Sequence, residues 1–127
     1  MRGFALLAGC TAALAACATP DRAIAPTAAA MAGDWTVDLR LGLADAPYGQ
    51  PMTLTLAENG DVSGTFYGST ILKGRAGTGQ NRACAAWQTA DNSGLYHHSG
   101  CLRDGEIVGQ TWSEGRTFVL PWTARRN

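Results

Sequence analysis

Apolar and polar residues alternate along most of the chain after residue 33, which is the pattern of half-buried β-strands. Residues 35–40 and 52–56 alternate clearly, and the turn signal Glu58-Asn59-Gly60 follows the second run. Gly, Asn and Asp clusters separate most of the later runs in the same way. The pattern predicts eight strands, at 35–40, 52–56, 61–67, 70–76, 82–90, 95–102, 106–112 and 116–122.

The phase of the apolar side chains fixes the register of the hairpin around Asn59-Gly60. A two-residue loop would set the apolar faces of the two strands on opposite sides of the sheet. A three-residue loop over 58–60, with Gly60 left-handed in a bulge, places every large apolar group on one face. The predicted pairs are Leu56 with Val62, Leu54 with Gly64, and Met52 with Phe66.

A second hairpin brings two cysteines together. If residues 91–94 form its loop, Ala90 faces Leu95, and the same register places Cys84 directly opposite Cys101. Cα atoms of such antiparallel pairs lie about 4.5–5.5 Å apart, which suits a disulfide. The bridge would contribute about 3 kcal/mol on the chain-entropy model. The alternative is a pair of reduced core cysteines.

Short strands joined mostly by tight turns favour an all-β fold, and the 16 glycines agree with this. The simplest topology is a small up-and-down antiparallel barrel of about eight strands with one disulfide. Closing the sheet would remove its exposed edges. The pattern does not decide whether the barrel closes, or which face of strands 82–90 and 95–102 points inward.

The first 16 residues do not alternate between apolar and polar positions. After Arg2, residues 4–16 are almost wholly apolar and rich in alanine, and small residues precede Cys17. This arrangement is typical of a secretory signal peptide and is too short for a transmembrane helix. An ordinary signal peptide of a soluble secreted protein is the alternative.

Leu14-Ala15-Ala16-Cys17 resembles the lipobox of bacterial lipoprotein signal peptides. In that class, cleavage precedes the cysteine, whose sulfur receives a diacylglycerol, so Cys17 is the expected lipidation site. Leu7-Ala8-Gly9-Cys10 also fits the lipobox pattern. It leaves an apolar core of only about six residues, short of the roughly 7–15 usually needed.

The lipoprotein resemblance implies a compartment and a domain plan. Without an aspartate after Cys17, it implies an anchor in the outer membrane, on its periplasmic face. Disulfides are the default in that oxidising compartment. The expected plan is a signal peptide at 1–16, a flexible tether at 17–32, a barrel at 33–123 and a tail at 124–127. Ten basic residues balance ten acidic ones, which argues against a nucleic-acid partner.

Two families share features of the barrel region. Gly33-Asp34-Trp35 opening a strand, then 52–56, Asn59-Gly60 and 64–67, resembles the start of avidin-type and lipocalin-type barrels, the calycin-like group. That resemblance implies a ligand-binding barrel but not biotin binding, because Val37 and Leu41 replace the polar residues of avidin. The Gly-x-Trp opening also resembles bacterial metalloprotease inhibitors, whose disulfide lies earlier in the domain.

His97 and His98 are the residues most suggestive of chemistry. Neighbours in a strand point to opposite faces, so they cannot chelate one metal ion together, and no metal or cofactor is expected. Ser99, His97 and Asp91 could be drawn as the catalytic triad of a hydrolase, but nothing in the sequence resembles a nucleophile elbow. Trp87, Tyr96 and His98 form an aromatic wall suited to a small ligand if the Trp87 face points inward, with packing of a filled core as the alternative.

These observations predict a non-enzymatic lipoprotein whose barrel binds a small apolar or amphipathic ligand, held at the membrane by its lipid anchor. Two alternatives remain open. One is a protease inhibitor whose N-terminal tether enters a protease cleft. The other is a structural envelope protein with a filled barrel that contacts protein partners.

Overall fold

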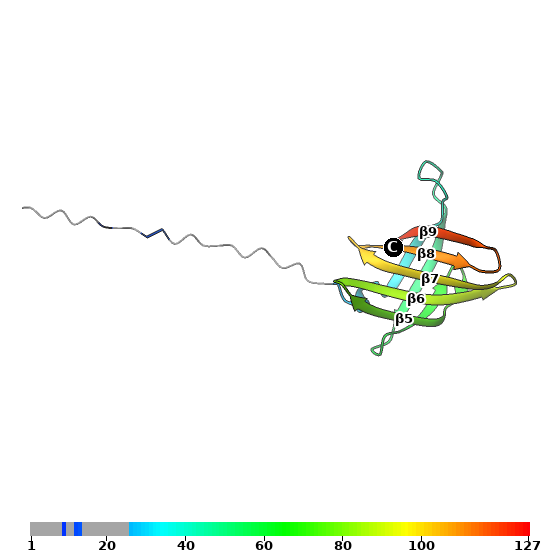
Figure 1. The fold of residues 1–127 in the computed structure, drawn as a ribbon, viewed down its shortest axis with the longest axis horizontal. Helices are drawn as coiled ribbons and strands as arrows, with labels where there is room; N and C mark the ends of the chain where they lie inside the picture. Colours follow the sequence, from blue (N-terminus) through cyan, green and yellow to red (C-terminus); the bar gives the residue numbers. More distant parts are fainter. Residues whose placement is uncertain (1–8, 10–11, 14–25) are drawn as a thin grey trace, which may run out of the picture.

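The computed structural model describes residues 26–127, together with residues 9, 12 and 13. Cys17 and the predicted signal peptide cleavage site lie outside these residues. The described chain opens with a short 3-10 helix and continues as strands (Figure 1). The elements are η1 (Ala28–Met31), β1 (Gly33–Asp38), β2 (Gly49–Leu56), β3 (Asp61–Phe66), β4 (Ser69–Thr70), β5 (Leu72–Gly79), β6 (Arg82–Asp91), β7 (Gly94–Arg103), β8 (Glu106–Ser113) and β9 (Phe118–Arg126).

The strands form one closed antiparallel barrel. Each long strand pairs with the next along the chain, and β9 returns to pair with β1, so that Val37 lies opposite Ala124. The two-residue strand β4 pairs only with β3, which leaves eight long strands around the barrel. The predicted all-β, up-and-down barrel is therefore confirmed, and the sheet closes.

The β2–β3 hairpin has the predicted register. Met52 lies opposite Phe66 and Leu56 opposite Val62, with Gly60 at a φ of 92° in the turn. Gly64 is required here because a Cβ on it would stand 2.0 Å from the backbone oxygen of Thr53. The close approach of the two backbones thus selects glycine at this position.

The β6–β7 hairpin also has the predicted register, with Cys84 opposite Cys101 and a disulfide between them. Asp91 and Gly94 pair as well, so the turn is shorter than the predicted loop at 91–94. Ala85 and Trp87 are buried inside the barrel, whereas Cys84 lies on the opposite, outer side of β6. The bridge is therefore on the surface of the barrel.

The strand predicted at 70–76 is present but not continuous, because the chain breaks at Ile71. This side chain is buried, and its N–H donates to the backbone oxygen of Gly64. Lys73 has a φ of 47°, and the pairing with β6 shifts its register between Leu72 and Arg75. Anchoring of Ile71 in the core thus divides the segment into β4 and β5.

The barrel includes residues on both sides of the range expected for it. Met31 is fully buried, and its backbone oxygen accepts a hydrogen bond of 3.0 Å from Trp35 Nε1. Arg126 donates to the backbone oxygens of Ala30 and Ala32 at 2.6 and 2.8 Å. β9 runs on to Arg126 and buries Ala124. The segment 28–32 consists mostly of small residues without periodicity and resembles a linker in the sequence. In the structure, it closes one end of the barrel.

Among the residues described, no helix is both long and apolar enough to cross a membrane.

Candidate functional site

A cavity of about 660 Å³ opens at one end of the barrel, which we call the mouth. Small-molecule sites commonly measure roughly 300–1,000 Å³. Figure 1 shows the β6–β7 and β8–β9 turns at this end, on the right, and the start of the described chain at the other end, on the left. The lining residues are Leu39, Leu41, Tyr48, Phe66, Tyr67, Ser69, Thr89, Asp91, Tyr96, His98, Thr111, Arg116, Phe118, Val119 and Leu120.

The polarity of the side chains that line the cavity changes from the mouth inward. Asp91 and Arg116, the only charged residues of the described chain that line the cavity, stand at the turns around its opening, and both are exposed. Apolar and aromatic side chains, including Phe118 and Leu120, form much of the wall. Phe66, which is 4% exposed, lies at the inner end. The cavity therefore offers a mainly apolar interior beneath a polar rim.

Four hydrogen-bonded side chains form a cluster at the inner end of the cavity, which we call the floor: Thr89, His98 and Thr111, which line the cavity, and Trp122, which bonds to Thr111 without lining it. His98 Nε2 lies 2.8 Å from Thr89 Oγ1, and His98 Nδ1 lies 2.7 Å from Thr111 Oγ1. Trp122 Nε1 donates to Thr111 Oγ1 at 2.9 Å. All four side chains are buried, so both ring nitrogens of His98 are bonded away from bulk water.

Burial lowers the pKa of His98 to about 4, and the neighbouring His97 adds to this effect. The ring is therefore neutral at physiological pH, and the floor carries no charge. A neutral imidazole has one N–H donor and one acceptor nitrogen. One threonine hydroxyl consequently donates to His98 and the other accepts from it.

The depressed pKa predicts a dependence of stability on pH. In the unfolded chain, a histidine binds a proton below about pH 6.5, whereas folded His98 does so only below about pH 4. Its contribution to stability is thus complete above pH 6.5 and is lost as the pH falls toward 4. We expect the His98-dependent part of the unfolding free energy to drop by about 2 kcal/mol between pH 7 and pH 5.

Urea titrations at pH 7, 6 and 5 measure this effect. The His98→Gln variant should lack most of the drop, while His97→Gln, altered on the outer face, should retain it. Equal pH dependence in the wild type and in His98→Gln would contradict the assignment.

Tyrosine hydroxyls link the rim. Tyr48 and Tyr67 share a hydrogen bond between their hydroxyl groups, and this bond raises the pKa of Tyr67. Across the mouth, the hydroxyl of Tyr96 donates to Asp91 Oδ2 at 2.8 Å. Arg116 extends its guanidinium over the ring of Phe118, 5.4 Å from the centroid. The entrance is consequently amphipathic.

The loop between β1 and β2 stands beside the mouth and is internally bonded. Arg40 Nε donates to Asp38 Oδ2 at 2.6 Å, and this bond, more than any other contact, lowers the pKa of Asp38 to about 2. The same guanidinium reaches the backbone oxygen of Asp45 at 3.2 Å. Leu41 and Leu43 are held outward, 88% and 94% exposed. Leu41 also lines the cavity.

The structure brings together the three residues of the predicted aromatic wall. The Trp87 and His98 rings stack with centroids 5.7 Å apart, and those of His98 and Tyr96 stack at 6.4 Å. Only Tyr96 and His98 line the cavity, because Trp87, 2% exposed, is packed behind His98 in the core. The wall thus extends from the core to the mouth.

The sequence reasoning missed the two threonines of the floor. Thr89 lies two residues after Trp87 and so shares its inward face. Thr111 lies opposite His98 in the β7–β8 pair. A two-residue turn at Asp104-Gly105 pairs Arg103 with Glu106 and, in the same register, His98 with Thr111.

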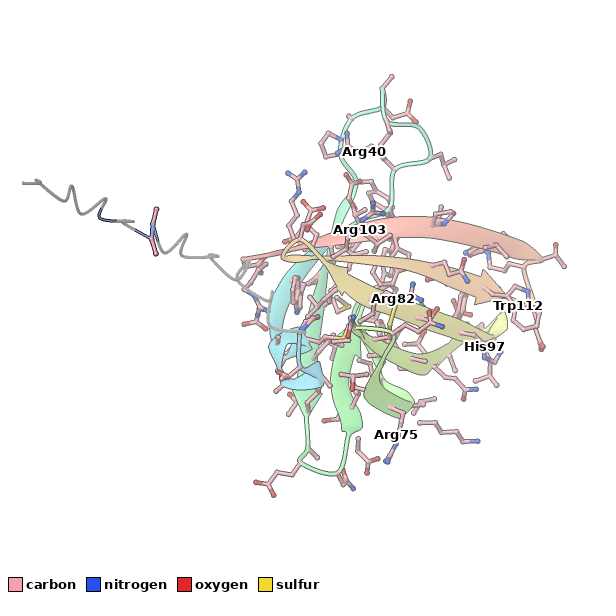
Figure 2. All side chains as sticks on the ribbon, turned by 60° about the vertical axis from the view of Figure 1, so that its left-hand side comes forward. Arg40, Arg75, Arg82, His97, Arg103 and Trp112 are labelled. Atoms are coloured by element: carbon pink, nitrogen blue, oxygen red, sulfur yellow. A yellow bond between two sulfur atoms is a disulfide. The ribbon has the colours of Figure 1, made fainter. Side chains whose placement is uncertain are left out.

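The other candidate residues lie outside the barrel or at its rim. His97 stacks on Trp112 on the outer surface, with ring centroids 5.1 Å apart (Figure 2). Asp91 accepts from Tyr96 and from the Ser93 backbone, so it does not serve a triad with His97. In the part of the chain that the structure describes, no three histidine, cysteine or acidic residues gather to hold a metal ion.

Comparisons with protein-family models, with curated proteins and with solved structures find no match to this chain. The function proposed for this protein therefore rests on its own sequence and geometry.

Proposed function

We propose that this protein is a lipid-anchored binding module of the bacterial outer membrane, and that its barrel takes up a small apolar or amphipathic ligand from the periplasm. The observation that carries the proposal is the cavity of about 660 Å³ at the mouth. Its apolar wall and polar rim match the usual composition of small-molecule sites. Burial of apolar ligand surface there would supply the main driving force.

The position of the mouth supports this arrangement. The described chain enters the barrel through η1, whose Met31 is buried beneath Trp35. η1 packs against β2, β5 and β6 at the closed end, away from the mouth. A membrane anchor at Cys17 would therefore hold the barrel from its closed end and leave the mouth open to the periplasm.

The geometry of the floor favours binding over catalysis. Both ring nitrogens of His98 are engaged by Thr89 and Thr111, and no carboxylate among the described residues bonds to the ring to orient it or raise its basicity. A general base would need a free nitrogen within reach of substrate. We accordingly propose a non-enzymatic role.

Uptake of N-phenyl-1-naphthylamine, a neutral dye that fluoresces in apolar surroundings, tests the proposal. We expect saturable binding by the full chain purified without detergent, after Cys17→Ser removes the proposed acylation site. Leu120→Trp should weaken the affinity by about tenfold or more, because the indole occupies space that the dye needs.

Thr123→Trp is the matched control, since it adds the same side chain to an exposed position of the same strand. It should bind the dye as the wild type does. Dye binding that is absent, or unaffected by Leu120→Trp, would contradict a site inside the barrel.

A second candidate function is contact with an envelope protein partner. Trp112 and Val119, paired across β8 and β9, are 47% and 60% exposed on the outer surface. Exposed aromatic residues are common at the centres of protein interfaces. Crosslinking in intact cells from position 112 tests this candidate: one discrete crosslinked protein would support it, whereas an uncrosslinked chain would not.

A further inference from the structure

The hydrogen bonds of the floor leave one donor unused. Trp122 Nε1, one ring nitrogen of neutral His98, and the hydroxyls of Thr89 and Thr111 together carry four polar hydrogens. Three hydrogen bonds join these four side chains, and they use three of the hydrogens. Because the indole hydrogen and the imidazole hydrogen are both engaged, the fourth belongs to a threonine hydroxyl.

This conclusion does not depend on the tautomer of His98. If Nε2 carries the proton, it donates to Thr89, and the Thr89 hydroxyl hydrogen is left over. If Nδ1 carries the proton, it donates to Thr111, and the Thr111 hydroxyl hydrogen is left over. Both threonines line the cavity, so in either case the spare donor is accessible to a molecule bound there.

Among the described residues, the surroundings of the floor offer no charge. Trp87, stacked on His98, adds a second donor, because its buried Nε1 has no hydrogen-bond partner among the described residues. The charged side chains that line the cavity, Asp91 and Arg116, stand at its rim. A carboxylate at the floor would therefore be a buried charge without a cationic partner. A hydrocarbon end would leave the hydroxyl unpaired.

We infer that the cavity selects ligands whose buried end carries an uncharged hydrogen-bond acceptor, such as a ketone, ester or ether oxygen, on an apolar body. The oxygen accepts from the spare threonine hydroxyl, and the apolar body packs against Phe66, Phe118 and Leu120. This inference rests on the proposed function, because it specifies the class of ligand that enters the same cavity.

Three compounds with one apolar body and different ends test the selection: 2-ethylnaphthalene, 2-acetylnaphthalene and 2-naphthoate. We expect 2-acetylnaphthalene to bind about tenfold more tightly than 2-ethylnaphthalene, and 2-naphthoate to bind most weakly, in calorimetric titrations at pH 7.5. The carbonyl stretch of bound 2-acetylnaphthalene should lie at lower wavenumber than in hexane, as expected for a hydrogen-bonded ketone.

A quadruple variant isolates the floor. Thr89→Val, His98→Phe and Thr111→Val remove the polar side chains of the floor that line the cavity, and Trp122→Phe removes the indole N–H that would otherwise lose its acceptor. Together these changes should abolish the preference for the ketone. Should this variant fail to fold, the order of affinities and the carbonyl band of the wild-type complex decide the question without it.

The outcomes separate the inference from the proposed function. Binding of 2-ethylnaphthalene as tight as that of the ketone, tightest binding of 2-naphthoate, or an unshifted carbonyl band overturns the inference alone. So does a protein that binds N-phenyl-1-naphthylamine and none of the three compounds. A protein that binds neither the dye nor these compounds overturns the proposed function as well.

Discussion

Replacement of Trp35 by alanine is expected to lower the free energy of unfolding by about 3–5 kcal/mol, in the range of large-to-small core substitutions of aromatic residues. Trp35 is fully buried, and it joins three parts of the fold that are distant in sequence. Its strand pairs with β2 and β9, and its Nε1 bonds to Met31 in η1. The substitution removes this packing and leaves a cavity at the closed end.

The indole also holds the end of the chain. The guanidinium of Arg126 lies over its ring, 4.1 Å from the centroid, and donates to the backbone of Ala30 and Ala32. Loss of the ring should therefore loosen η1 and the end of β9 together. Urea unfolding followed by far-ultraviolet circular dichroism measures the effect, because this signal arises mainly from the backbone and each variant is compared with its own folded and unfolded baselines.

Trp112→Ala provides the control for Trp35→Ala. The Trp112 ring is 47% exposed and packs on His97 outside the barrel, so its loss should cost under about 1 kcal/mol. Equal destabilisation by the two substitutions would show that the closed end is not organised around Trp35.

Removal of the disulfide, by Cys84→Ala with Cys101→Ala, is expected to cost about 3 kcal/mol of stability. The bridge joins residues 17 positions apart, and cross-linking them restricts the unfolded chain. The backbone pairing of β6 with β7 runs without interruption from Cys84 to Asp91. Because this pairing does not depend on the bridge, the folded barrel should persist when the bridge is removed.

Ligand affinity distinguishes this stability effect from an effect on function. Cys84 and Cys101 lie on the outer side of the barrel and do not line the cavity. Dye affinity should therefore be unchanged in the double variant under native conditions. A loss of affinity at a urea concentration where the variant is fully folded would contradict the separation of the bridge from the cavity.

The two hairpin registers were predictable because local chemistry determines them. A glycine that must be left-handed and a single apolar face set β2 against β3, and the turn residues at 91–94 set Cys84 against Cys101. The face of β6 was not predictable from its own residues. Alanines and a cysteine alternate along it, and only closure of the barrel shows that Trp87 points inward.

The cavity depends on parts of the chain that are far apart in sequence, and no single pattern reveals it. Its rim combines the loop after β1, the turn after β3 and the turns after β6 and β8. The break at Ile71 was missed for a related reason. In the sequence, Ile71 looks like an ordinary apolar position of a strand. The contact that breaks the strand, the hydrogen bond from the Ile71 N–H to the backbone oxygen of Gly64, becomes visible only in the folded chain.

Native mass spectrometry of the protein, extracted gently from its own membrane, tests the central proposal most directly. We expect a chain that begins at an acylated Cys17 and lacks the two hydrogens lost when the Cys84–Cys101 bridge forms. We also expect a small non-covalent adduct that dissociates on denaturation and is absent from Leu120→Trp. A wild-type protein that carries no adduct even after incubation with a lipid extract of that membrane, or an adduct retained equally by Leu120→Trp, would contradict a ligand site in the barrel.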